Sequence, residues 1–235
     1  MSSTEIWPDA DALAGAIAQR ILDRLAQVQQ SGRTPSIVLT GGTIAIAAYE
    51  RIQAGAVDWT DVDVYWGDER FVPAGHADRN DQQARDAFLT RLGVPAARLH
   101  TMPAADEGFP SIGAAADAHA SDLPDGPFDL VLLGVGPDGH IASLFPGFPQ
   151  VHETVRRAVE VLDSPKPPPQ RISLTYPALN HATTVWFLVS GEGKAEAVAR
   201  ALGGATPDEI PAAGAHGTDE TVWLLDADAA STLTP

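Results

Sequence analysis

One histidine and one aspartate end a glycine-rich turn that follows an apolar run, in the segment FDLVLLGVGPDGHIASLFPG (128–147). The apolar and branched residues of FDLVLLG are typical of a buried strand. His140 is therefore expected just beyond the end of a strand, with Asp138 shortly before it. Histidine is the side chain best suited to moving protons near neutral pH, and a neighbouring carboxylate orients or tunes it. The pattern predicts a functional histidine; the alternative is a histidine that packs or caps locally.

The same turn matches G-x-G-x-x-G, the pattern of a dinucleotide-binding loop, at Gly134, Gly136 and Gly139. A dinucleotide site needs a full helix after the third glycine, because that helix packs on the sheet and its N-terminus holds the pyrophosphate. Pro146 interrupts the segment soon after the turn. A dinucleotide is therefore disfavoured, and no cofactor is expected.

Two further turns have features of an anion-binding site. The segment SIVLTGGT (36–43) leads from a strand through Gly41 and Gly42 to Thr43, where a helix is expected to begin. The free N–H groups and positive dipole end of such a helix suit a phosphate. Lys194 lies at the start of another helix, where its charge opposes the dipole unless an anion is bound there. The alternatives are a plain turn capped by Thr43 and an exposed lysine without a role.

Charged residues also follow another predicted strand, in VYWGDERFVPAGHADRN (64–80). Arg70 lies in this cluster, and Arg171 begins the predicted strand RISLT. Either arginine can serve an anionic substrate. A solvated loop explains the cluster equally well, with Asp78 or Asn80 capping the next helix.

Strands alternate with helices along most of the chain. Strands are expected at 36–40, 62–66, 128–134, 158–162, 171–175, 184–190 and 221–225, and helices at 8–30, 44–54, 80–92 and 192–202. This order predicts the α/β class: a single Rossmann-like domain over 1–235, with a mostly parallel sheet and helices on both faces. The stretches 103–127 and 164–170 are expected to be surface connections, although part of 111–123 can form a helix. Ligands bind beyond the carboxyl ends of such strands, where the candidate turns lie.

The chain of 235 residues has 31 Asp and Glu against 15 Lys and Arg, a formal charge of −16. This charge repels nucleic-acid phosphates and anionic membranes, so neither is expected as a partner. An anionic substrate then requires a local group of cations, and lysine occurs only as Lys166 and Lys194.

Cysteine is absent, which excludes disulfides, thiolate metal sites and thiol nucleophiles. The seven histidines have no metal-binding spacing, so no metal is expected. The sequence shows no signal region and no apolar run of the roughly 20 residues that a membrane span needs, which predicts a cytoplasmic protein. The oligomeric state stays open, and a monomer is compatible with the sequence.

Taken together, the motifs resemble the 6-phosphogluconolactonase family, within the larger group that includes glucosamine-6-phosphate deaminases and isomerases. The matching pieces, in the family's order from residue 36 to about 200, are LTGGT, WGDERFVP, HADRN, LLGVGPDGHIASLFPG, RISLT and GEGKAEAV. Deaminase-like members typically continue the histidine segment toward Ala-Phe-Asn-Glu-Pro and carry Asp-Glu-Tyr after the second strand. This chain instead has ASLFP at 142–146 and GDER at 67–70. The lactonase branch is therefore the better match.

Two positions depart from the family pattern. The first loop is more often Ser-Gly-Gly-Ser-Thr-Pro, whereas this chain has TGGTIA at 40–45. The backbone N–H groups of the loop remain available to an anion. Arg79 stands where many members have serine, and it either adds a cation near the substrate or lies on the surface.

The resemblance implies hydrolysis of 6-phospho-D-glucono-1,5-lactone to 6-phosphogluconate, in the oxidative pentose phosphate pathway and without a cofactor. It implies that His140 activates water, that Arg70 stabilises the oxyanion, and that Asp138 positions His140. The residues expected to bind the 6-phosphate are Gly41, Gly42, Thr43, Arg171 and Lys194. The alternatives are a sugar-phosphate isomerase or deaminase with the same phosphate pocket, and a non-catalytic sugar-phosphate-binding regulator.

Overall fold

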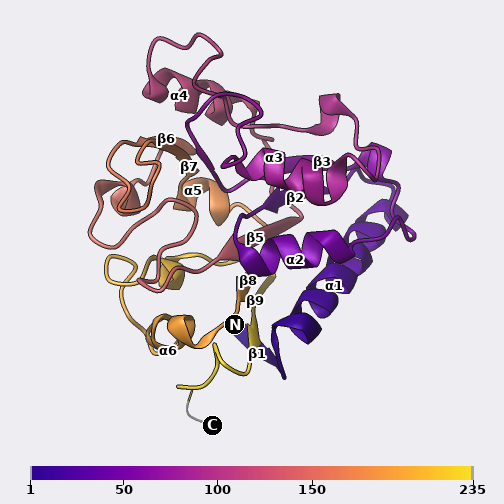
Figure 1. The fold of residues 1–235 in the computed structure, drawn as a ribbon, viewed down its shortest axis with the longest axis vertical. Coiled ribbons are helices and arrows are strands. Elements are labelled where there is room, and N and C mark those ends of the chain that lie inside the picture. Colours follow the sequence, from indigo (N-terminus) through magenta and orange to yellow (C-terminus); the bar gives the residue numbers. More distant parts are fainter. Residues whose placement is uncertain (1, 234–235) are drawn as a thin grey trace.

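The computed structural model describes residues 2–233, and within them the strands form two sheets (Figure 1). The larger sheet has the order β1-β9-β8-β5-β2-β3, and every neighbouring pair is parallel. Its strands are β1 (Ser2–Trp7), β2 (Ser36–Leu39), β3 (Asp63–Trp66), β5 (Leu130–Gly134), β8 (Thr184–Val189) and β9 (Glu220–Asp226). The smaller sheet is antiparallel in the order β4-β7-β6, with β4 (Asp68–Arg70), β6 (Ala158–Val161) and β7 (Arg171–Leu174).

The helices connect these strands. The α-helices are α1 (Ala10–Gln30), α2 (Thr43–Arg51), α3 (Asn80–Ala84), α4 (Ile112–Asp122), α5 (Tyr176–Leu179) and α6 (Ala195–Leu202). Short 3-10 helices lie at Trp59–Asp61, Ala96–Arg98, Pro149–His152, Glu192–Lys194 and Pro211–Gly214, and a π-helix at Arg85–Leu89 follows α3.

Helix α1 shows how the sequence pattern becomes structure. Ile17, Ile21 and Leu25 recur every four residues, so they share one face of the helix, and all three are fully buried. Asp9 is the N-cap of the helix, because its side chain accepts a hydrogen bond of 2.8 Å from the backbone N–H of Ala12. The sequence predicted a helix over 8–30, and α1 occupies nearly all of that range.

Helices cover both faces of the larger sheet, and the central strand β5 contributes to both cores. α1 and α2 lie on one side of the sheet (Figure 1). Leu130 and Leu132 pack in the core that includes residues of these two helices. Val131 and Leu133 pack in the opposite core, which includes residues of α4 and α6. All four side chains are fully buried. The predicted α/β class, with a mostly parallel sheet covered on both faces, is confirmed.

Some elements differ from the prediction. The segments 158–162 and 171–175 pair with each other antiparallel, outside the parallel sheet. Their connection is short and proline-rich, whereas parallel neighbours need a crossover of about a dozen residues or more, usually a helix. β1 and β4 were not predicted: β1 is a polar, exposed edge strand and β4 is very short, so neither has an apolar run. The predicted helix 80–92 changes to a π-helix at Arg85. The helix that the sequence allowed within 111–123 is present as α4.

Candidate active site

A cavity of about 280 Å³ lies beyond the carboxyl ends of β2 and β5, beside the smaller sheet. Among the residues that line it are Gly41, Gly42, Arg70, His140, Lys166, Arg171 and Lys194. A larger hollow of about 690 Å³ adjoins it, is lined by Thr43 and shares Gly41, Gly42 and Lys194 with it. The structure therefore brings together the turns that the sequence singled out, and it adds Lys166.

His140 and Asp138 form a hydrogen-bonded pair at this cavity. His140 Nδ1 lies 2.5 Å from Asp138 Oδ1, and the ring packs against Phe145 at 4.7 Å between centroids. A Cβ at position 136 would clash with both His140 Nδ1 and Asp138 Oδ1, so the loop needs Gly136 for the pair to form. His140 Nε2 makes no hydrogen bond within residues 2–233, which leaves this nitrogen available to a water molecule or substrate.

The pair has the protonation pattern of a general base and its orienting group. Partial burial acts to raise the pKa of Asp138, but the hydrogen bond and charge of His140 outweigh it and lower this pKa to about 2. Asp138 is therefore an anion at neutral pH and accepts the proton on Nδ1 of the histidine. In neutral imidazole, that tautomer leaves the lone pair on Nε2.

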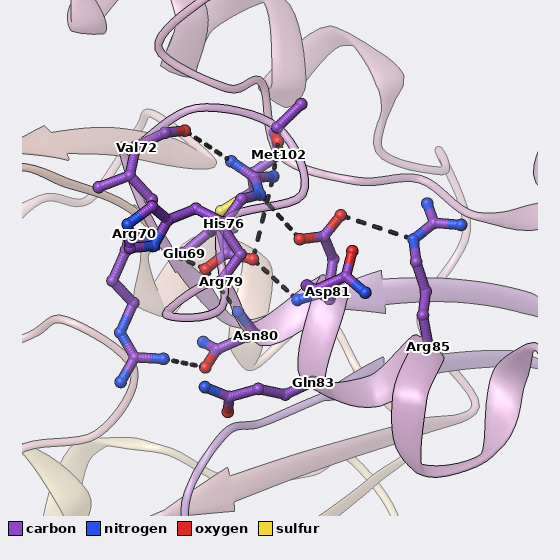
Figure 2. Close-up of polar contacts among 12 residues, drawn as sticks. Glu69, Arg70, Val72, His76, Arg79, Asn80, Asp81, Gln83, Arg85 and Met102 are labelled. Carbon is purple, nitrogen blue, oxygen red and sulfur yellow. Dashed lines mark hydrogen bonds and ion pairs between the residues drawn. The ribbon is translucent and has the colours of Figure 1, made fainter.

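Arg70 faces the same cavity from β4. Its Nη1 donates a hydrogen bond to Oδ1 of Asn80, and its Nε is buried without a hydrogen-bond partner among the described residues (Figure 2). No carboxylate in residues 2–233 forms an ion pair with this guanidinium. Arg70 therefore forms no ion pair with its sequence neighbours Asp68 and Glu69.

Asn80, at the start of α3, holds Arg70 in place. Its Nδ2 donates to the backbone oxygen of Asp68 at 2.8 Å, and its own N–H donates to Glu69 Oε1 at 2.8 Å. A Cβ at Gly41 would clash with Asn80 Oδ1. Glycine at position 41 therefore lets the loop before α2 pack directly against the amide that orients the arginine. Sequence reasoning considered Asn80 only as a helix cap, and missed this contact.

Arg79 lies neither near the substrate cavity nor on the surface, the two positions that the sequence suggested. It is 2% exposed, so it does not lie on the surface, and it does not line the cavity. Its Nε donates to Asp81 Oδ1 at 2.7 Å, its Nη2 donates to the backbone oxygen of Met102 at 2.7 Å, and Glu69 lies 3.9 Å away (Figure 2). Burial raises the pKa of Glu69, and Arg79 together with backbone N–H donors opposes that rise. This buried cluster braces the segment that carries Arg70 and Asn80.

Lys194 lies where β8 ends, in the 3-10 turn that precedes α6. Asp226 stabilises this turn, since its carboxylate accepts hydrogen bonds from Ser190 Oγ at 2.5 Å and from the Gly191 N–H at 3.0 Å. Burial lowers the pKa of Lys194, and the charge of Lys166 lowers it further. Within residues 2–233 the Lys194 ammonium has no carboxylate partner.

Arg171 lines the cavity but uses most of its donors within the protein. It is 5% exposed, its Nη1 lies 3.5 Å from Asp68 Oδ2, and Nε donates to the Pro168 backbone oxygen at 3.2 Å. Burial lowers its pKa. Its expected role as a phosphate ligand stays a prediction.

The described residues contain no cluster of three or more His, Cys, Asp or Glu side chains placed to hold a metal ion. No helix in residues 2–233 has the length and apolar character that a membrane crossing requires.

Known proteins are similar to this chain in sequence and in fold. The family described as glucosamine-6-phosphate isomerases/6-phosphogluconolactonase matches residues 8–223. The 6-phosphogluconolactonase of Mycobacterium tuberculosis is 48% identical over 243 residues, which cover 99% of this chain and 98% of the relative. That of Streptomyces coelicolor is 46% identical and covers 96% of this chain and 92% of the relative.

A solved structure agrees with these relatives. The 6-phosphogluconolactonase of Trypanosoma brucei superposes with a TM-score of 0.84 at 25% identity, over 100% of this chain and 99% of that one. From the family match over most of its length and the identity to bacterial relatives, the chain belongs to the 6-phosphogluconolactonase family, within the glucosamine-6-phosphate isomerase/6-phosphogluconolactonase superfamily.

Proposed function

We propose that the protein hydrolyses 6-phospho-D-glucono-1,5-lactone to 6-phosphogluconate, with His140 as the general base. The full-length similarity to 6-phosphogluconolactonases makes the chain a lactone hydrolase of this kind. The observation that carries the mechanism is the Asp138–His140 pair, which leaves Nε2 available at a cavity lined by cations.

The reaction begins with a water molecule between His140 and the lactone. Nε2 takes a proton from the water as its oxygen attacks carbonyl carbon C1, and negative charge develops on the carbonyl oxygen. Arg70, held by Asn80, stabilises this charge. The tetrahedral intermediate collapses as the C1–O5 ester bond breaks, and the imidazolium returns its proton to O5. The net change is the addition of one water across the ester, which gives the open-chain acid.

Asp138 supports both proton transfers. Its carboxylate fixes the histidine tautomer before the attack, and it stabilises the imidazolium while the intermediate exists. Arg70 supplies charge without a carboxylate partner, so its charge is not already neutralised before the substrate arrives.

We propose that the 6-phosphate binds at the loop 41–43 and Lys194, and Arg171 lines the same cavity as Lys194. Gly42 precedes α2. The first N–H groups of a helix have no hydrogen-bond partner within the helix, so they are available to an anion. Binding the phosphate here orients the lactone, so that recognition at one end serves catalysis at the other. We place the reaction in the cytoplasm, on the composition of the chain.

The decisive measurement is an assay on freshly generated lactone, coupled to oxidation of 6-phosphogluconate and corrected for spontaneous hydrolysis. Enzyme-dependent release of 6-phosphogluconate is expected. Formation of ammonia or a ketose phosphate from an amino or aldose sugar phosphate, without lactone hydrolysis, would instead identify a deaminase or isomerase. Tight binding of sugar phosphates without any turnover would identify a regulator.

A further inference from the structure

We propose that Lys166 is a second ligand for the substrate's phosphate, acting together with Lys194, and that Arg171 serves this site by holding the loop that carries Lys166. The inference rests on the proposed function and extends it to a residue that the sequence motifs left without a role.

The first support is where the lysines lie. The chain contains two lysines against 31 acidic residues, and both line the same cavity of about 280 Å³. Within residues 2–233 neither ammonium forms an ion pair with a carboxylate. In so acidic a protein, lysines that lie on the surface by chance readily find acidic neighbours. Asp138 acts on Lys194 only from beyond ion-pair distance. Two lysines without an ion pair at one cavity indicate that their partner is an anion from outside the chain.

The second support is the interaction between the two ammonium groups. The charge of Lys166 contributes to lowering the pKa of Lys194, so the two lie close enough to repel each other. Such repulsion disfavours the charged form of Lys194 when no anion is bound. A dianion bound between them converts the repulsion into attraction on both sides. A phosphate monoester has this charge near neutral pH.

The third support is the loop itself, 164–170. The backbone oxygen of Lys166 accepts hydrogen bonds from Arg171 Nη2 at 3.2 Å and from Ser164 Oγ at 3.0 Å. Arg171 Nε donates to the backbone oxygen of Pro168 at 3.2 Å. The buried guanidinium therefore binds the backbone on both sides of Pro167, a residue that lines the cavity. Arg171 is accordingly a positioning residue, and the flexible lysine is the side chain that reaches the anion.

Lys166 lines the same cavity as His140 and Arg70, and we assign it to the phosphate because its charge acts on Lys194. Its electrostatic neighbour is Lys194, which belongs to the wall formed with Gly41 and Gly42. The carbonyl end is served by His140 and by Arg70, whose guanidinium is held at Asn80. Loss of Lys166 should therefore affect recognition of the phosphate and leave the chemistry of the lactone ring in place.

The first experiment compares Lys166→Met with the parent protein on 6-phosphogluconolactone and on glucono-1,5-lactone, which lacks the phosphate. Loss of one charged contact should lower kcat/KM for the phosphorylated lactone by about 10- to 100-fold and leave the other substrate within about twofold. The matched control is Arg200→Met, which removes one positive charge at an exposed site outside the cavity and should change neither. Equal losses on both substrates, or no loss, would overturn the assignment.

The second experiment tests the role of Arg171 by a double-mutant cycle. Arg171→Lys keeps the charge but cannot donate to both loop carbonyls, so KM for the phosphorylated lactone should rise. The double variant with Lys166→Met should be no worse than Lys166→Met alone, because Arg171 acts through Lys166. Additive losses would show that Arg171 binds the phosphate itself. Ser164→Ala loosens the same loop without a change of charge, and should give a smaller rise in KM even if the Arg171 variant does not fold.

Binding of inorganic phosphate, measured by calorimetry, separates this inference from the proposed function. Lys166→Met should weaken phosphate binding whether or not the parent protein hydrolyses the lactone. If the parent protein hydrolyses the lactone but both proteins bind phosphate equally, the role of Lys166 is refuted and the proposed function stands.

Discussion

His140 owes its suitability for catalysis to the difference between its two ring nitrogens. Nδ1 is bound to Asp138, whereas Nε2 has no partner among the described residues. Two nitrogens bound within the protein would give a structural histidine, and two unbound nitrogens would give one with no fixed tautomer. Arg70 shows a similar contrast, since one end of its guanidinium is fixed by Asn80 and its charge has no carboxylate partner.

Replacing His140 with Asn should lower kcat by about 10²–10⁴-fold, because a general base acts in the transition state. KM should change little, since Nε2 is not required to hold the ground-state substrate. Steady-state kinetics on the phosphorylated lactone measure both effects, and a thermal melting curve checks that the variant is folded. A folded variant with near-normal kcat would rule out His140 as the base.

Replacing Arg70 with Lys should lower turnover by about 10²–10³-fold, the usual effect of losing one oxyanion donor. Lysine keeps the charge but loses the planar group that binds Asn80 and that, in the proposed mechanism, also contacts the carbonyl oxygen. Turnover and melting temperature should be measured side by side. Full activity with a lowered melting temperature would show that Arg70 stabilises the fold and takes no part in the reaction.

At the scale of elements, the site is a junction between the parallel sheet and the smaller antiparallel sheet. The larger sheet brings the glycine loops and His140, and β4 and β7 of the smaller sheet bring Arg70 and Arg171. A buried contact joins the two parts: Ser143 Oγ, just beyond the histidine loop, donates to Asp68 Oδ2 on β4 at 2.6 Å. The distance between His140 and Arg70 thus depends on how the two sheets pack against each other.

Gly41→Ala tests the packing at this junction. Its Cβ would clash with Asn80 Oδ1, so Asn80 must shift and release Arg70. We expect kcat on glucono-1,5-lactone, which lacks the phosphate, to fall as well, because the damage reaches the oxyanion site. The control is Gly15→Ala in α1, where no atom lies within 4 Å of the added Cβ. It should leave kcat unchanged and raise stability by roughly 0.5–1 kcal/mol. A loss confined to the phosphorylated substrate would contradict the proposed link.

At the scale of the whole molecule, the formal charge of −16 and the cationic cavity oppose each other. An acidic surface keeps other polyanions away, and the cavity concentrates positive charge for one small anion. The charges of Lys166 and Lys194, which are partly buried and form no ion pair within residues 2–233, lower the stability of the protein when no anion is bound, a common relation between function and stability.

Lys194→Met should therefore raise the melting temperature of the unliganded protein at pH 7. Burial, followed by the charge of Lys166, lowers the pKa of Lys194 in the folded state below its value in the unfolded chain. The folded state thus disfavours the ammonium form, and the resulting loss of stability is fully present below the folded-state pKa. It disappears as the pH rises above the unfolded-state pKa, so the two proteins should converge in alkaline buffer.

Saturating 6-phosphogluconate provides the control for this prediction. It should stabilise the parent protein more than the Lys194→Met variant, because the ligand binds the parent more tightly. A variant that is less stable than the parent at neutral pH without ligand would contradict the view that Lys194 is kept for binding at a cost in stability.

The sequence by itself determined the elements and the local chemistry. The apolar pattern predicted α1 and every strand of the parallel sheet except β1, because burial on one or both faces of an element depends on residues close together in the chain. The Asp138–His140 pair was predictable for the same reason, since two residues in one tight loop are neighbours in any fold that keeps the loop. The glycine turns after the strands likewise indicated the edge of the sheet at which the cavity lies.

Only the tertiary structure decided which distant residues meet. Asn80 holds Arg70 against Gly41, Arg79 is enclosed by Glu69 and Asp81, and Lys166 lies near Lys194, although no local pattern relates these positions. The direction of a long polar side chain depends on the charges and carbonyl groups that other segments place around it. Those partners come from elements far apart in the sequence, so the burial of Arg79 and the place of Lys166 at the cavity became visible only in the tertiary structure.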